Sequence, residues 1–146
     1  MYNGLLHAHS GLRWLVLLFL ILAIVNAATK MNGQKAYGAS DKRVGLLALI
    51  FTHVQLILGL VLYFISPKVQ FAGEVMSDKI LRFYTVEHIS LMLIAIVLIT
   101  MGYSKAKRKA EDGQKFKTTF WYYFIGLVLI LISIPWPFRG LGAGLF

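Results

Sequence analysis

Four histidines, an arginine and a glutamate lie in or beside the long apolar runs of this chain. The histidines are His7 and His9 in NGLLHAHSGLRW, His53 in FTHVQLILG and His88 in FYTVEHISLML. Arg13 follows His9 by four residues, and Glu87 directly precedes His88. Ionisable groups inside membrane segments are costly, so they usually face the protein interior and mark a functional site. Their placement is the main clue to function.

Neutral imidazoles on different helices of a bundle can ligate a metal through their ring nitrogens. The simplest arrangement is a b-type haem held between two histidines, and the candidate ligands are His9, His53 and His88. The propionates of such a haem need a cation, and the planar fork of Arg13 can hold a carboxylate through two bonds. Glu87 could exchange protons with a quinol at the same level of the membrane.

Other interpretations of the same residues stay open. The histidines with Glu87 could bind zinc, iron or copper without haem, because imidazole suits several metals. Arg13 and Glu87 could instead form a buried ion pair that braces two helices. His53 could be a core histidine bonded to a backbone carbonyl, and His7 a polar residue at the water interface. The chain would then be a cofactor-free accessory subunit of a membrane complex.

The elements that would position these residues follow from the composition. Of the 146 residues, 58% are hydrophobic and only 14% are charged, whereas a soluble domain carries about 25% charged residues. The apolar residues form runs of about twenty, long enough to cross a bilayer. The sequence therefore predicts one integral membrane domain over residues 1–146. Its spanning helices are expected at about 4–29, 43–65, 78–103 and 118–136.

Short connections make successive helices antiparallel, which predicts an all-α, up-down-up-down four-helix bundle. Asn3 and Ser77 are the expected N-caps of the first and third helices. Pro67 should end the second helix, and Pro135 with Pro137 should end the fourth. The glycine-rich GLGAG near the carboxyl end is expected to be a flexible tail. The absence of cysteine excludes disulfides, thiolate-bound iron–sulfur clusters and covalently attached c-type haem.

Basic residues cluster in two of the expected loops, 30–43 and 104–117, whereas 66–77 and both termini are nearly uncharged. The net charge of +9 therefore reflects topology and attraction to anionic headgroups, and no nucleic-acid partner is expected. The positive-inside rule places the basic loops in the cytoplasm and both termini outside the inner membrane.

Heights along the helices follow from the rise of about 1.5 Å per residue. Measured from the cations at the inner edge, His9 lies roughly 31 Å up, and Arg13 and His88 roughly 26 Å. His53 lies only about 15 Å up, near the bilayer middle. Of the possible axial pairs, His9 with His88 matches best in height, and His53 with His88 is second. Glu87 belongs to the upper layer.

Three stretches also carry a resemblance: LLHAHSGLRWLVLL, FTHVQLILGLVLYF and LRFYTVEHISLMLIAIVL. In these stretches the chain resembles the short membrane proteins, common among Bacteroidetes, that are labelled cytochrome b. More loosely, it is similar to the four-helix b-type cytochromes that exchange electrons with quinones. The resemblance covers most of the first three helices, whereas the fourth matches only as a generic apolar helix.

The resemblance implies a haem b cofactor and electron transfer. Our first hypothesis is that the electrons pass between quinol and a partner near the outer face. His9, His53 and His88 inherit candidate ligand roles, and Arg13 a contact to a propionate. Larger diheme relatives have enough histidines to ligate two haems, often with help from helix four. This chain has four histidines and none on its fourth helix, so a single haem is expected. A homodimer or a larger complex would suit the lipid-facing surfaces that remain.

Overall fold

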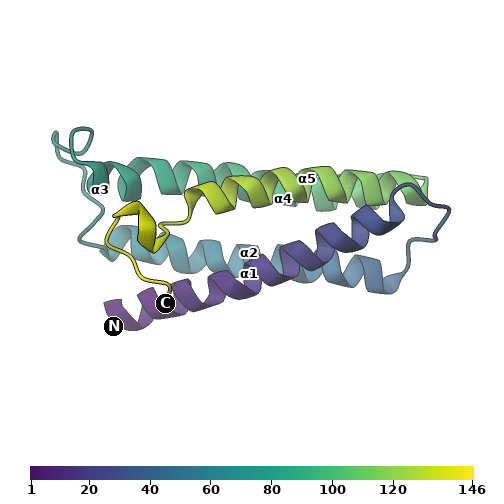
Figure 1. The fold of residues 1–146 in the computed structure, drawn as a ribbon, viewed down its shortest axis with the longest axis horizontal. Helices are drawn as coiled ribbons and strands as arrows, with labels where there is room; N and C mark the ends of the chain where they lie inside the picture. Colours follow the sequence, from purple (N-terminus) through teal and green to yellow (C-terminus); the bar gives the residue numbers. More distant parts are fainter.

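The computed structural model describes residues 1–146 and contains helices but no strand. Four helical spans are long and apolar enough to cross a membrane. They are α1 (Tyr2–Lys30), α2 (Ala39–Ile65), the continuous helix Lys79–Arg108, and α5 (Asp112–Ser133). Figure 1 shows them running antiparallel along the long axis, with both chain termini at one end. The expected all-α four-helix bundle is confirmed, and the chain is a multi-pass membrane protein.

The third span changes its helical geometry near its beginning. It consists of α3 (Lys79–Arg82), a π-helix η1 (Phe83–Glu87) and α4 (His88–Arg108). The N–H of His88 bonds to the carbonyl oxygen of Phe83, five residues back. Such π-turns are rare in proteins, and those that occur often lie at functional sites. This turn lies directly before His88, one of the candidate ligands.

The four spans form a ring in which each contacts two neighbours. α1 packs on α2 and α5, and α4 packs on α5, whereas α2 and α4 meet less closely. The closest packing is between α4 and α5. A Cβ atom added to Gly126 would lie 2.7 Å from Cγ1 of Ile99, and one added to Gly102 would lie 2.4 Å from Cβ of Tyr122. Because glycine has no Cβ atom, Gly102 and Gly126 allow the backbones of α4 and α5 to lie close together.

The hydrophobic core runs along the bundle, from Ala48 and Tyr123 towards the basic end to Ile134 after α5. Leu20 and Ile99 are fully buried there. The hydroxyl of Tyr123 donates to the carbonyl oxygen of Gly45 at 2.8 Å, which ties α5 to α2 across the ring. The half near the termini is packed less completely and contains a cavity.

Several helix ends differ from the expected ones. Met1, not Asn3, precedes α1 and makes no side-chain cap. Asp78, not Ser77, caps α3, since its carboxylate accepts from the N–H groups of Ile80 and Leu81 at 2.8 and 2.9 Å. A carboxylate suits this position because it also complements the helix dipole. Ser66 ends α2 directly before Pro67, as expected.

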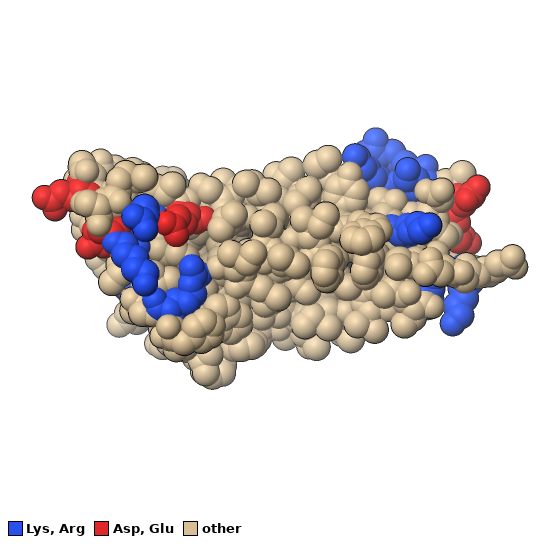
Figure 2. Space-filling view, turned by 45° about the horizontal axis from the view of Figure 1, so that its top comes forward, with Lys and Arg blue, Asp and Glu red and all other residues tan.

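The basic loops are shorter than predicted. α2 begins at Ala39, four residues early, because the carboxylate of Asp41 accepts from the N–H of Gly38 at 2.8 Å. α4 continues to Arg108, and α5 already begins at Asp112. Lysine and arginine are good helix formers, so their charge does not end a helix that neighbouring turns support. On the face drawn in Figure 2, the charged side chains gather at the two ends of the bundle and leave an uncharged band between them.

The carboxyl-terminal segment is ordered, in contrast to the flexible tail that was expected. After α5 ends at Ser133, the short 3₁₀ helix η2 (Pro137–Arg139) leads into residues 140–146. Gly140 and Gly142 have φ of 64° and 66°, a conformation that glycine adopts without strain. These turns bring the segment back over the end of the bundle, where Leu141 is buried. It therefore forms one wall of the cavity.

A candidate cofactor site between the four spans

A cavity of about 200 Å³ lies inside the bundle at the end that holds both termini. All four spans and the segment 140–146 contribute to its wall. Its polar lining residues are Tyr2, His9, Ser10, Arg13, Thr52, Gln55, Tyr63, Ser66, Lys68, Tyr84 and His88. The remaining wall is mainly aliphatic, with Val16, Leu62, Met92 and Ile96 among its members. An apolar enclosure with a few convergent polar groups is typical of a ligand site.

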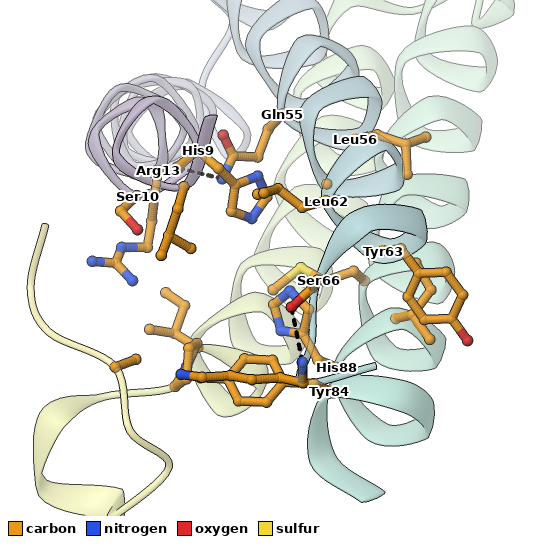
Figure 3. A pocket seen from close by; sticks show the side chains of 18 of the residues that line it. His9, Ser10, Arg13, Gln55, Leu56, Leu62, Tyr63, Ser66, Tyr84 and His88 are labelled. Carbon is orange, nitrogen blue, oxygen red and sulfur yellow. Dashed lines mark hydrogen bonds between the residues drawn. The ribbon is translucent and has the colours of Figure 1, made fainter. Parts of the chain in front are cut away.

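The imidazole rings of His9 and His88 lie on facing walls of this cavity (Figure 3). The centroids of the two rings are 6.4 Å apart, and the ring planes are inclined by 73°. His9 comes from α1 and His88 from the first residue of α4, on opposite corners of the ring of helices. The structure thus brings together His9 and His88, the two histidines whose expected heights along the helices match best.

The orientation of His88 is set by the end of α5. Its Nδ1 lies 2.8 Å from the carbonyl oxygen of Ser133, which can only accept, so Nδ1 carries the hydrogen. The lone pair of the ring is then on Nε2. In a continuing helix that carbonyl would accept from the N–H of residue 137, but residue 137 is a proline and has none. Pro137 therefore leaves the oxygen of Ser133 available to His88.

His9 is positioned by contacts with two residues of α2. The side-chain amide of Gln55 donates to the carbonyl oxygen of His9 at 2.8 Å. The imidazole ring packs over Gly59, where an added Cβ atom would lie 3.1 Å from Cε1 of the ring. Nδ1 of His9 is buried without a hydrogen-bond partner. The absence of a side chain at position 59 is thus what makes room for this ring.

Arg13, one turn along α1 from His9, is a buried guanidinium with no carboxylate within 4.0 Å. Its Nη2 donates to the carbonyl oxygen of Leu145 at 2.5 Å. The guanidinium carbon lies 5.3 Å from the ring centre of Trp14 and 5.9 Å from that of Trp136. A buried cation normally has an anionic partner, because its desolvation is otherwise uncompensated. Its surroundings therefore suit an anionic group of a ligand.

All of the buried side-chain nitrogen and oxygen atoms that lack a partner belong to this cavity. They are Nδ1 of His9, Nε of Arg13 and Oε1 of Gln55. Buried polar groups are almost always hydrogen-bonded, so each exception needs an explanation. Three exceptions around one cavity, with none elsewhere in the chain, indicate a site built for a polar ligand.

The other predicted residues lie outside the cavity. Nδ1 of His53 donates to the carbonyl oxygen of Leu49 at 2.8 Å, and Nε2 lies 3.4 Å from the hydroxyl of Thr100. This is the arrangement of a core histidine bonded to its own helix. His7 is exposed on α1.

Glu87 pairs with Arg82 at 2.8 Å, and not with Arg13. Residues five apart do not share a face of an α-helix, but the i→i+5 bonding of a π-helix brings them together. The π-turn at 83–87 therefore gives Glu87 a partner on its own span. The side chain of Glu87 remains 41% exposed. The buried ion pair between Arg13 and Glu87, one of the alternatives from the sequence, does not form.

Sequence reasoning missed Lys68 and Ser133. Lys68 follows α2, and its Nζ donates to the carbonyl oxygen of Gly142 at 2.5 Å and lies 5.0 Å from the ring centre of Tyr84. It is the second cation on the cavity wall, after Arg13. A lysine three residues after a helix carries no recognisable signal. The role of Ser133 did have a signal in the sequence, because Pro137, four residues later, has no N–H to bond to its carbonyl oxygen.

These features define a class of protein. It is a four-helix membrane protein with an internal, mainly apolar cavity into which two histidines point. No protein-family model matches the chain, and no match is found among curated proteins or solved structures. No cluster of three or more histidine, cysteine, aspartate or glutamate side chains is arranged to hold a metal ion. The function therefore has to be argued from the cavity itself.

Proposed function

We propose that this chain is a haem b protein of the membrane that transfers electrons between quinol and a partner near the outer face. The observation that carries the proposal is the pair of imidazoles, His9 and His88, facing each other at 6.4 Å inside an apolar enclosure. Neutral imidazole nitrogens are common metal ligands, so His9 and His88 are the residues that would hold the haem iron. The spacing and the free Nε2 of His88 fit a metal between the two rings.

The cations of the wall fit the two propionates of a haem. Arg13 and Lys68 both line the cavity, and each donates to a carbonyl oxygen of the segment 140–146. Carboxylates are stronger acceptors for these charged donors than carbonyls are. A tetrapyrrole is larger than the 200 Å³ cavity, so binding requires the wall to open, and we propose that the segment 140–146 is the part that moves. The donors that it releases would then be available to the propionates.

The haem would supply a one-electron couple, and the chain would tune it. His88 is an oriented ligand because its Nδ1–H is bonded to Ser133. Such a bond fixes the tautomer and raises the basicity of the ligating nitrogen. The aliphatic wall, with Met92 and Ile96, limits the access of water and keeps the dielectric low around the site.

Quinol is the electron donor in this proposal: its oxidation releases two electrons, passed on one at a time, and two protons, one of which Glu87 accepts while the other leaves to water. Glu87 directly precedes His88 in the chain, is 41% exposed and does not line the cavity. A quinol diffusing in the lipid could therefore reach Glu87 without entering the bundle. The basic ends of the helices would lie in the cytoplasm, which puts the cavity and both termini near the outer face of the inner membrane.

The first experiment is a dithionite-reduced minus oxidised visible spectrum of the purified protein, with metal analysis of the same sample. A sharp reduced α-band with about one iron per chain is expected. Bound zinc, copper or iron without a haem band would favour a non-haem metal site at His9 and His88. Absence of both would leave a cofactor-free subunit and would contradict the proposal.

A further inference from the structure

A second hollow, of about 380 Å³, lies at the opposite end of the bundle, where the basic segments meet. It is lined by Lys42 near the start of α2, Lys107 near the end of α4 and Lys115 in the first turn of α5. Tyr37, Gly38 and Ala39 complete the wall. Three separate segments thus direct their lysines to one place.

The three acids at this end, Asp41, Glu111 and Asp112, do not neutralise the hollow. Glu111 is exposed and forms no ion pair. Asp41 is buried and pairs with Lys30 at 2.5 Å, and it also accepts from Asn26. Asp112, at the edge of the hollow, pairs with Lys115 at 3.3 Å and accepts from the N–H of Tyr37. This leaves two of the three lining lysines uncompensated.

Neither Lys42 nor Lys107 pairs with a carboxylate. Lys107 lies 5.2 Å from the ring centre of Tyr103, and both lysines are exposed. α2 begins at Ala39 in the wall of this hollow, so the positive end of its helix dipole also lies there. The hollow therefore has an excess of positive charge that the protein does not balance.

We propose that this hollow binds the headgroup phosphate of an anionic phospholipid. Its lysines come from the basic ends of α2, α4 and α5, and α2 and α4 pack less closely than the other neighbours. Their outer faces carry exposed aliphatic side chains, Ile50 and Val54 on α2 and Val97 and Met101 on α4. Acyl chains can lie along these faces while the phosphate contacts the lysines. Basic pockets between membrane helices are known to bind anionic headgroups in this way.

The test compares two variants of equal charge in the purified full-length protein. Lys42→Gln/Lys107→Gln removes two lysines of the hollow, whereas Lys109→Gln/Lys117→Gln removes two exposed lysines of the same basic end that do not line it. Binding of phosphatidylglycerol is measured in neutral detergent, with phosphatidylcholine and inorganic phosphate as separate ligands. Neither pair of lysines belongs to the cavity of the proposed haem.

Phosphatidylglycerol should bind the unmodified protein, and phosphatidylcholine should not. Affinity should fall about thirtyfold in Lys42→Gln/Lys107→Gln, because each lysine near an anionic surface contributes about 1 kcal/mol. It should change less than about threefold in Lys109→Gln/Lys117→Gln, where only long-range, screened attraction is lost. An equal loss in both variants would show diffuse attraction and overturn the site. Inorganic phosphate binding as tightly as the lipid would also overturn it.

Discussion

Nδ1 of His88 donates a hydrogen bond to the carbonyl oxygen of Ser133, 2.8 Å away at the end of α5. The oxygen is free because α5 ends here, where Ile134 is extended before Pro135, and because the residue four positions later, Pro137, has no N–H. The same pattern recurs two residues earlier, where Pro135 leaves the oxygen of Leu131 to the indole N–H of Trp136 at 2.9 Å. The end of one helix thus orients a side chain on another.

Pro135→Ala/Pro137→Ala is expected to weaken cofactor binding by about tenfold. Without Pro135, Ile134 can stay helical and α5 can continue, so the new N–H at position 137 can compete with His88 for the oxygen of Ser133. Loss of such an outer bond typically costs 10–100-fold in affinity. Titration of haem into the ligand-free protein measures the effect. Pro135→Ala alone is the matched control, because it changes the same residue of the cavity wall but leaves position 137 without an N–H. Equal affinities for the two variants would show that the bond to Ser133 does not matter.

The four histidines should separate into two groups. His9→Ala and His88→Ala should each abolish or convert the low-spin spectrum of a haem with two histidine ligands, because each removes one of the facing rings. His7→Ala and His53→Ala should keep it, since these rings lie outside the cavity. Reduced-minus-oxidised spectra of the four variants test this. Retention of the spectrum in His88→Ala with its loss in His53→Ala would refute the assignment.

Arg13→Met should stabilise the ligand-free protein and weaken ligand binding at the same time. Removing a buried charge that has no carboxylate partner relieves its desolvation, and we expect a gain of about 1 kcal/mol. The same change removes the donor proposed for a propionate, so haem affinity should fall. Thermal unfolding in detergent and haem titration measure the two effects separately. A structural role alone predicts that both quantities fall together.

Gly126→Ala should destabilise the bundle without a direct effect on the cavity. The new Cβ would lie 2.7 Å from Cγ1 of Ile99 and 3.4 Å from the carbonyl oxygen of Ala95. Overpacking of this kind costs about 1–3 kcal/mol. Gly11→Ala is the control, because nothing lies within 4 Å of the added Cβ and alanine favours the helix. Unfolding in detergent should therefore shift in opposite directions for the two variants.

The sequence alone determined the four spans, their antiparallel order and the heights of the polar residues. These properties depend on the number of residues between two points, since each helical residue adds about 1.5 Å along the axis. Counting from the basic ends is enough to put His9 and His88 at one level and His53 below them. The charge pattern of the loops is also readable without a structure.

Only the tertiary structure decided which side chains meet. Direction around a helix depends on the rotation and tilt of each span, and one π-turn changes it for every residue that follows. That turn gave Glu87 the partner Arg82 in place of Arg13. The return of the carboxyl-terminal segment over Arg13 and Lys68 likewise depends on two glycines with positive φ and on contacts more than seventy residues apart in the chain. No local pattern encodes such contacts, because they form only when the four helices have packed.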